Sequence, residues 1–361
     1  MRKLLAIAIL AGLAGFVTAQ DAKKDPPKKE KPEPTLKVGD PAPPIKADKW
    51  LQGEAIKTFT PGKVYVVEFW ATWCGPCIVM MPHMGEMQAE YKDRGVTFIG
   101  YTSKDQNNSE EKVTAFVKKR GPKLGYTFAY SDTRETNDAW MKAAGRNGIP
   151  CCFVVDKKGT IAYIGHPMYL DVVMPKVAAG EWTEADVKKL DEIEKDVNAV
   201  FRSINNPDAE AGLKAVAEFD SKNPALAHIP YFVGPKISLL LRAKRINEAK
   251  KMAADVVAKA QKQEDPMALN AVSRALRIPG VPADKELTQL MLTSAEAGLK
   301  LAGEKDLGAL LNVADAHFAA GDKAKAREYG AKALAAADNP RTKEAVERMI
   351  KKYDDEKKDD K

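Results

Sequence analysis

Two cysteines, Cys74 and Cys77, are separated by a Gly-Pro dipeptide, and this C-G-P-C segment is the strongest chemical feature of the chain. The run before it, residues 63–70, is rich in β-branched and aromatic residues and is typical of a buried central strand. Residues 77–94 are predicted to form a helix. The first sulfur then lies at a helix N-terminus, where unpaired N–H groups and the helix dipole favour an anion. We therefore expect a redox dithiol in which Cys74 is the thiolate.

The segments around this dithiol predict the layer that must position it. Between Val38 and about Gly165, strand-like and helix-like segments alternate, which favours an α/β fold with helices on both faces of a sheet. Strands are expected at 64–70, 96–101, 128–130, 152–156 and 160–164, and helices after Cys77, at 110–120 and at 136–144.

The rest of the chain, residues 181–361, is predicted to be an all-helical domain. From about Thr183, Ala, Leu, Lys and Glu recur at helical spacing and the strand pattern stops. Two segments, 245–257 and 322–334, are self-similar, and each follows an apolar helix through a short turn. The second unit resembles a tetratricopeptide repeat, in which small residues let paired helices pack closely. An irregular helical bundle is an alternative of nearly equal weight.

The first residues have the parts of a secretory signal. Arg2 and Lys3 precede an apolar run that ends in V-T-A, so residues 1–19 are predicted to be a signal peptide cleaved after Ala19, with an uncleaved anchor as the alternative. Residues 20–36 are nearly all charged or proline and are predicted to be a disordered linker. The mature protein is then expected outside the cytoplasm, in the periplasm.

Composition narrows the function classes. Lys and Arg number 57 against 50 Asp and Glu, a net charge of +7 that is spread over helices rich in both signs. This distribution indicates a solvated surface and not a nucleic-acid interface. The 4 cysteines occur in only two places, which favours chemistry over a disulfide scaffold.

Three motifs occur in a fixed order along the first half of the chain. They are V-G-D-P-A-P at 38–43, E-F-W-A-T-W-C-G-P-C at 68–77, and G-I-P at 148–150 before a strand hairpin. Together they resemble the thioredoxin superfamily, and within it the secreted thiol-disulfide oxidoreductases of the TlpA/ResA type. The resemblance covers about residues 37–170. It implies a thioredoxin-like fold, a mixed central sheet flanked by helices, for a domain at 37–180.

The resemblance also implies roles for individual residues. In that family the proline matching Pro150 is cis and faces the dithiol, and the preceding residue, here Ile149, offers its backbone to substrate. The Cys74 thiolate would attack a substrate disulfide, and Cys77 would resolve the mixed disulfide. Glu68 matches the buried acid of thioredoxin and would take the proton from Cys77, because a buried carboxyl has a raised pKa. The alternative places Glu68 half-exposed on an edge strand.

The residues that border the nucleophile are the expected substrate contacts. Trp73 is expected to contact substrate or to pack beside Cys74, and Gly75 and Pro76 form the dithiol loop, whereas Trp70 is predicted to be core. The Gly-Pro dipeptide resembles thioredoxin itself, which implies a reductase; strongly oxidising relatives have a histidine there. No cofactor beyond the Cys74–Cys77 disulfide is implied. Substrate proteins with disulfides and a membrane thiol transporter as electron donor are the implied partners.

Cys151 and Cys152 stand directly after the G-I-P motif, where the family typically has threonine or another small residue. In a strand, they point to opposite faces, and one of them is placed to approach the dithiol. Packing as small buried hydrophobes is the favoured interpretation. A second redox site is the alternative.

Other functions stay open. His83, His166, His228 and His317 show no metal-ligand spacing, yet His83 or His166 could approach a metal held by the cysteines, as in copper-delivery proteins of similar fold. A protein-interaction scaffold is a second alternative, because helical repeats usually present a concave binding face. A peroxiredoxin is disfavoured, because its P-x-x-x-T-x-x-C motif is absent.

Overall fold

The computed structural model describes residues 33–278 and 284–354. The predicted signal peptide and most of the predicted linker lie outside the described residues. From Pro34 onward the described chain forms one compact unit. Within the described ranges, the helices are all too short or too polar to cross a bilayer.

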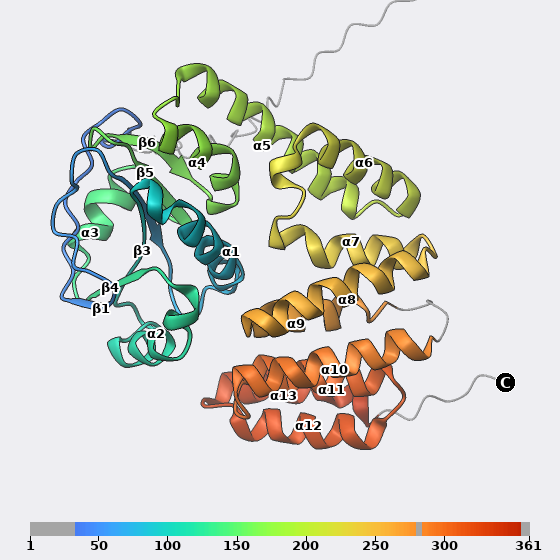
Figure 1. The fold of residues 1–361 in the computed structure, drawn as a ribbon. Helices are drawn as coiled ribbons and strands as arrows, with labels where there is room; N and C mark the ends of the chain where they lie inside the picture. Colours follow the sequence, from blue (N-terminus) through green and yellow to red (C-terminus); the bar gives the residue numbers. More distant parts are fainter. Residues whose placement is uncertain (1–32, 279–283, 355–361) are drawn as a thin grey trace, which may run out of the picture. The chain divides into compact units, whose positions relative to one another are not determined.

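A mixed sheet of six strands forms the centre of the first half of the described chain (Figure 1). The strand order is β1-β4-β3-β2-β5-β6. The strands β2, β3 and β4 are parallel, while β5 pairs antiparallel with β2, β6 with β5, and β1 with β4. Their bounds are β1 Lys49–Gln52, β2 Val64–Phe69, β3 Val96–Ser103, β4 Thr127–Ser131, β5 Cys151–Val155 and β6 Ile161–Gly165. The predicted thioredoxin-like fold is confirmed.

Helices cover both faces of this sheet. One face packs against α1 Gly75–Tyr91, α2 Glu110–Leu124 and α4 Leu170–Ala179, and the other against α3 Glu135–Asn137 and the π-turn η2 Asp138–Lys142. Strand β2 shows the alternation that divides these two cores. Val64 and Val66 belong to the α1 side, while Tyr65 and Val67 belong to the side that contains Trp140.

The second half of the described chain is all helical, as predicted. Its helices are α5 Glu184–Ile204, α6 Ala209–Lys222, α7 Pro230–Arg242, α8 Ile246–Gln263, α9 Pro266–Ala275, α10 Lys285–Ala302, α11 Leu307–Ala319, α12 Lys323–Ala336 and α13 Pro340–Ile350. The two self-similar segments begin at the N-cap residues of α8 and α12 and cover most of each helix. Ala314 and Ala326 are buried between α11 and α12, which agrees with close packing through small residues. The tetratricopeptide assignment stays a prediction.

A continuous hydrophobic cluster joins the two halves. Buried side chains of α5 to α7, among them Leu190, Val200 and Phe232, belong to the same cluster as Met84 of α1 and Val173 of α4. We call this cluster the shared core. A second cluster lies within the helices from α7 to α11. The helical region therefore packs on the face of the sheet that carries the dithiol helix.

The fold begins earlier than the sequence analysis placed it. The backbone N–H groups of Thr35 and Leu36 both donate to the Ala143 carbonyl, at 2.8 and 3.0 Å. Leu36 is buried in the cluster that contains Trp140. The predicted linker 20–36 thus overlaps the folded unit at its last three residues, Pro34 to Leu36.

Candidate active site

The dithiol lies where the sequence predicted it, at the start of α1. Cys74 is the N-cap residue, and Gly75 and Pro76 form the beginning of the first turn. The two cysteines form a disulfide. The backbone N–H of Cys77 donates to the Cys74 Sγ at 3.2 Å. An N-cap sulfur that accepts an amide hydrogen bond is favoured as a thiolate once the disulfide is reduced.

The redox sulfurs are covered, while their neighbours are exposed. Cys74 is 3% exposed and Cys77 is 0% exposed, whereas Trp73 is 54% exposed. Trp70 is buried against Phe116 and Phe128, as the sequence predicted. Trp73 is therefore the exposed side chain directly before the covered Cys74.

A cavity of about 480 Å³ opens beside the dithiol loop. Trp73 and Ile149, two of the predicted substrate-binding residues, both line it, together with Arg134, Lys142 and Arg146. The Ile149–Pro150 peptide bond is cis, as the resemblance implied. Gly75 and Pro76 do not line this cavity. The structure thus brings Trp73 and Ile149 together at one cavity, and the dithiol loop residues Gly75 and Pro76 lie outside it.

Glu68 is buried at the centre of the sheet. It lies on β2, which is flanked by β3 and β5, so the alternative of a half-exposed edge position is wrong. Both carboxyl oxygens are without a hydrogen-bond partner, and burial raises the pKa of Glu68 well above its ordinary value. Residues of even number on β2 face α1, so Glu68 points toward the dithiol helix. A carboxyl group whose pKa is raised by burial is a stronger base than an exposed one, and in its ionised form it can take a proton from a thiol.

The adjacent cysteines divide between the two faces, as predicted. Cys151 belongs to the core on the Trp140 side, and Cys152 belongs to the cluster that contains Cys74 and Cys77. Cys152 pairs with Glu68 across the β2–β5 ladder. Both are free thiols, and burial raises the pKa of Cys151 to about 12 and that of Cys152 well above its ordinary value. Buried neutral thiols are poor nucleophiles, which favours the packing interpretation.

The histidines near the dithiol are engaged elsewhere. The Nε2 of His83 lies 2.8 Å from the Asp171 carboxylate, and its Nδ1 lies 3.6 Å from that of Glu86. The Nδ1 of His166 accepts a hydrogen bond from the Met168 N–H at 3.1 Å. Across the described ranges, three or more metal-ligating side chains do not gather in one place. The copper-delivery alternative gains no support from this arrangement.

Asn108, which the sequence analysis did not single out, holds the loop before the dithiol. Its Oδ1 accepts from the N–H and the hydroxyl of Thr72, at 2.9 and 2.8 Å, and its Nδ2 donates to Thr102 and Ser103. The Trp73 Nε1 donates to the Asp105 carboxylate at 2.9 Å. The loop after β3 therefore sets the position of residues 72 and 73. Asn108 is buried and the adjacent Asn107 is exposed, but the two asparagines look alike in the sequence, and no motif marks Asn108.

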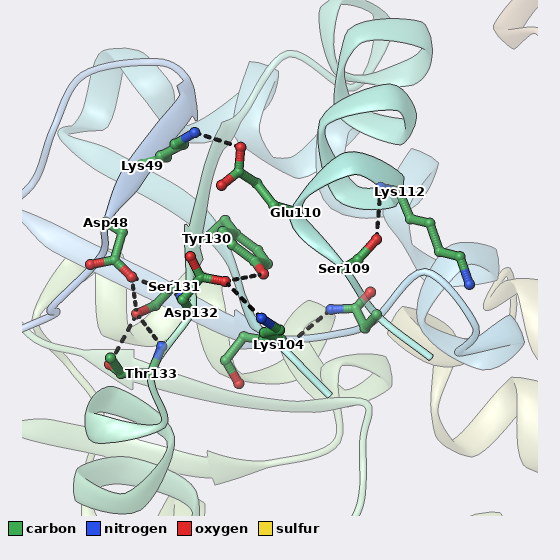
Figure 2. A network of polar contacts seen from close by, with 12 residues as sticks. Asp48, Lys49, Lys104, Ser109, Glu110, Lys112, Tyr130, Ser131, Asp132 and Thr133 are labelled. Atoms are coloured by element: carbon green, nitrogen blue, oxygen red, sulfur yellow. Dashed lines mark hydrogen bonds and ion pairs between the residues drawn. The ribbon is translucent and has the colours of Figure 1, made fainter. Parts of the chain in front are cut away.

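A polar network fixes the ends of the strands next to this loop. Figure 2 shows Ser131 at the end of β4 donating to Asp48, at 2.8 Å, and Tyr130 donating to Asp132, at 3.0 Å. The Asp132 carboxylate also pairs with Lys104, the residue directly after β3. The network ties the strand ends to the loop that carries Asp105 and Asn108, and hence indirectly supports the dithiol.

A second unforeseen contact comes from the helical region. The Tyr231 hydroxyl, on the first turn of α7, donates to the Pro76 carbonyl at 2.8 Å. The two residues are 155 positions apart, so no local pattern could have indicated the contact.

Comparisons with known proteins agree with this geometry. Residues 37–168 match the family model described as redoxin. Protein FixW of Rhizobium leguminosarum is 32% identical over 160 residues, which cover 43% of this chain and 72% of FixW. The thiol-disulfide oxidoreductase ResA of Bacillus thuringiensis (strain Al Hakam) is 30% identical over 163 residues, or 44% of this chain and 83% of ResA.

Among solved structures, the thioredoxin domain of a thiol-disulfide oxidoreductase from Bacteroides vulgatus is 23% identical, with a TM-score of 0.34 over 39% of this chain and 99% of that chain. The segment that matches the redoxin family contains the dithiol, Glu68 and Pro150. The chain therefore belongs to the redoxin family and is a thiol-disulfide oxidoreductase of the ResA kind, followed by a helical region.

Proposed function

We propose that this oxidoreductase works outside the cytoplasm, in the periplasm, as a reductase of disulfides in substrate proteins. The observation that carries the proposal is the setting of the Cys74 sulfur. It accepts the Cys77 N–H at the start of α1, and the two residues between the cysteines, Gly75 and Pro76, place no charge beside it. Strongly oxidising pairs need extra stabilisation of the thiolate, which an uncharged dithiol loop does not supply. The signal-like residues 1–19 support the compartment.

The reaction proceeds by two exchange steps. In the reduced protein the Cys74 thiolate attacks one sulfur of the substrate disulfide, which forms a mixed disulfide and releases the other substrate sulfur as a thiolate. Cys77 then loses its proton, for which Glu68 is the acceptor, and attacks the Cys74 sulfur. The second substrate thiolate leaves, and the protein retains the Cys74–Cys77 disulfide. Two electrons have then passed to the substrate.

A new cycle requires a dithiol donor that reduces the Cys74–Cys77 disulfide by the same two steps in reverse order. In an oxidising compartment this donor is proposed to be a membrane thiol transporter, as the family resemblance implies. Trp73 and Ile149 line the groove beside the dithiol, where they would receive the substrate segment.

The reduction potential of the pair tests the direction. The mature protein is equilibrated in dithiothreitol or glutathione buffers, and alkylated thiols are counted by mass spectrometry. A potential near the roughly −270 mV of thioredoxin is expected, whereas a value near the roughly −120 mV of the oxidant DsbA would reverse the direction. The Cys74→Ser variant is the control, because it has no pair to cycle.

An interaction scaffold is the second candidate, and a groove of about 740 Å³ between α1 and helices α7 to α9 favours it. The helical region shares a core with the sheet, so the test uses the full chain. The Cys77→Ala variant traps substrates as mixed disulfides, and the Cys74→Ala/Cys77→Ala variant cannot. Partners held only by the first variant support an enzyme; partners held equally by both support a scaffold.

A further inference from the structure

The Pro76–Cys77 peptide group carries two hydrogen bonds that point in one direction. On one side its N–H, from Cys77, donates to the Cys74 Sγ at 3.2 Å. On the other side its carbonyl, from Pro76, accepts from the Tyr231 hydroxyl at 2.8 Å. A hydrogen bond accepted by an amide carbonyl polarises the amide and strengthens the bond that its N–H donates.

We propose that Tyr231 of the helical region is a positioning residue for the exchange reaction, which acts through the Pro76–Cys77 amide to stabilise negative charge on the Cys74 sulfur. Tyr231 lies outside the segment that matches the redoxin family, because that segment ends at residue 168. The inference rests on Cys74 being the attacking thiol, the role proposed above.

The surroundings of Tyr231 keep its hydroxyl a donor. Burial, and secondarily the carboxyl of Glu68, raise the pKa of Tyr231 above its ordinary value, so the phenol stays protonated. Its ring meets that of His166 edge to face, with centroids 5.4 Å apart. Burial lowers the pKa of His166 to about 4, so this ring is neutral near pH 7. The neutral His166 ring therefore places no charge beside the Tyr231 hydroxyl that would turn it away from Pro76.

The size of the effect follows from the bonds involved. Cooperative polarisation changes the strength of a hydrogen bond by about 10–30%, and the bond affected here is one to a charged sulfur, which is stronger than a neutral one. Loss of the Tyr231 hydroxyl should therefore lower the acidity constant of the Cys74 thiol by about 1.3- to 4.5-fold.

The experiment measures alkylation of Cys74 by iodoacetamide against pH, in a Cys77→Ser background that keeps the Cys77 amide. Peptide mapping confirms that Cys74 is the residue modified. Tyr231→Phe is expected to raise the midpoint of the profile by about 0.1–0.7 pH units, the same 1.3- to 4.5-fold change. The plateau rate at high pH should rise by about twofold at most, because the thiolate is as accessible as before and its nucleophilicity increases only weakly with its pKa. The assay needs neither substrate nor donor, so its outcome is independent of whether the protein is a reductase.

Matched variants separate this role from a structural one. Tyr353→Phe removes another tyrosine hydroxyl of the helical region, which donates to Asp315 at 2.7 Å, and should leave the midpoint unchanged. The Tyr231→Phe shift should persist in a Glu68→Gln background. An unchanged midpoint, a change confined to the plateau, or a shift that disappears with Glu68→Gln would each overturn the proposal. A change confined to the plateau would mean that Tyr231 only covers the Cys74 sulfur. A shift that disappears with Glu68→Gln would mean that the titration of Glu68 causes the shift.

Discussion

Glu68 is the residue whose environment departs most from that of an ordinary carboxyl group. It is 2% exposed, and neither oxygen has a partner. If it accepts the Cys77 proton, Glu68→Gln should slow resolution of the mixed disulfide by about a hundredfold, because general bases typically contribute this much or more. Rapid-quench measurement of the mixed disulfide with a model substrate near pH 7 gives the rate. Glu90→Gln, a change of an exposed carboxyl on the dithiol helix α1, is the control. Equal rates for both variants would remove Glu68 from the mechanism.

The same burial makes stability depend on pH. The folded pKa of Glu68 is raised above the unfolded value, so the unfolded chain ionises first as the pH rises. The contribution of Glu68 is therefore fully present below its ordinary pKa of about 4.3 and is lost as the pH rises toward the folded value, by at most about 1.4 kcal/mol per pH unit. Urea unfolding between pH 4 and 9 should show a steeper decline for the wild type than for Glu68→Gln. Parallel curves would mean that Glu68 is ionised in the folded protein.

At the level of residues, the sequence predicted those parts of the site that are close together along the chain. Cys74, Cys77 and Glu68 lie on one strand and the turn that follows it, and the type and spacing of these residues indicate their chemistry. Asn108 and Tyr231 were missed because their contacts depend on how separate elements meet. A polar loop residue and a tyrosine have the same appearance in sequence whether or not they touch an active site.

Among the elements, the loop between β3 and α2 positions the dithiol loop. Asn108 is fully buried and makes four hydrogen bonds, two of them to Thr72. Asn108→Ala should cost about 2–3 kcal/mol in the free energy of unfolding, because buried polar partners lose their hydrogen bonds, and it should also slow disulfide exchange. Thermal unfolding and an insulin-reduction assay measure the two effects. Asn107→Ala, which removes an exposed side chain next to it, should change neither. Full exchange activity in a folded Asn108→Ala protein would contradict the positioning role.

Helices α1 and α4 are linked by a charged pair. Burial alone would lower the pKa of His83, but Asp171 on α4 and Glu86 on α1 outweigh it and raise the pKa to about 9. The folded value lies above the unfolded value of about 6.5, so this stabilisation is fully present below pH 6.5 and is lost as the pH rises through about 9. His83→Gln should destabilise by about 2 kcal/mol at pH 6 and progressively less as the pH rises from about 6.5 to about 9. Denaturant unfolding at several pH values measures this, with the exposed His228→Gln as the control. A destabilisation that does not change with pH would mean that His83 is neutral in the fold.

The elements that the sequence failed to predict are short or irregular. Strand β1, Lys49–Gln52, is an edge strand of four residues with a register shift, too short for an alternation to be recognised. The helix predicted at 136–144 divides into the short α3 and a π-turn, because periodicity reports which side is buried and not the hydrogen-bond register. The longer buried strands and amphipathic helices were predictable because their periodic patterns extend over several residues.

In the whole molecule, the shared core makes the helical region part of the oxidoreductase fold. Charged contacts across the junction include Lys259 with Glu86 at 2.8 Å and Arg120 with Asp265 at 3.5 Å. These pairs link α8 and α9 to the helices that cover the sheet. The change in composition divides the chain at about residue 180. Composition does not indicate, however, that apolar faces of α5 to α7 pack against α1 and α4. The boundary between two separate domains therefore stays a prediction of the sequence.

Phe232 tests whether the two halves unfold together. Its side chain is 1% exposed and packs between Phe201 and Phe219 in the shared core. Phe232→Ala should lower the free energy of unfolding by about 3–5 kcal/mol, as for other buried phenylalanines. If the core is continuous, amide exchange in β2 should become faster, and the free energy of opening that it reports should fall by the same amount. Leu310→Ala, in a separate cluster of α11 to α13, is the matched control and should leave exchange in β2 unchanged. Faster exchange confined to α5–α9 in Phe232→Ala would show instead that the sheet keeps its stability without the helices.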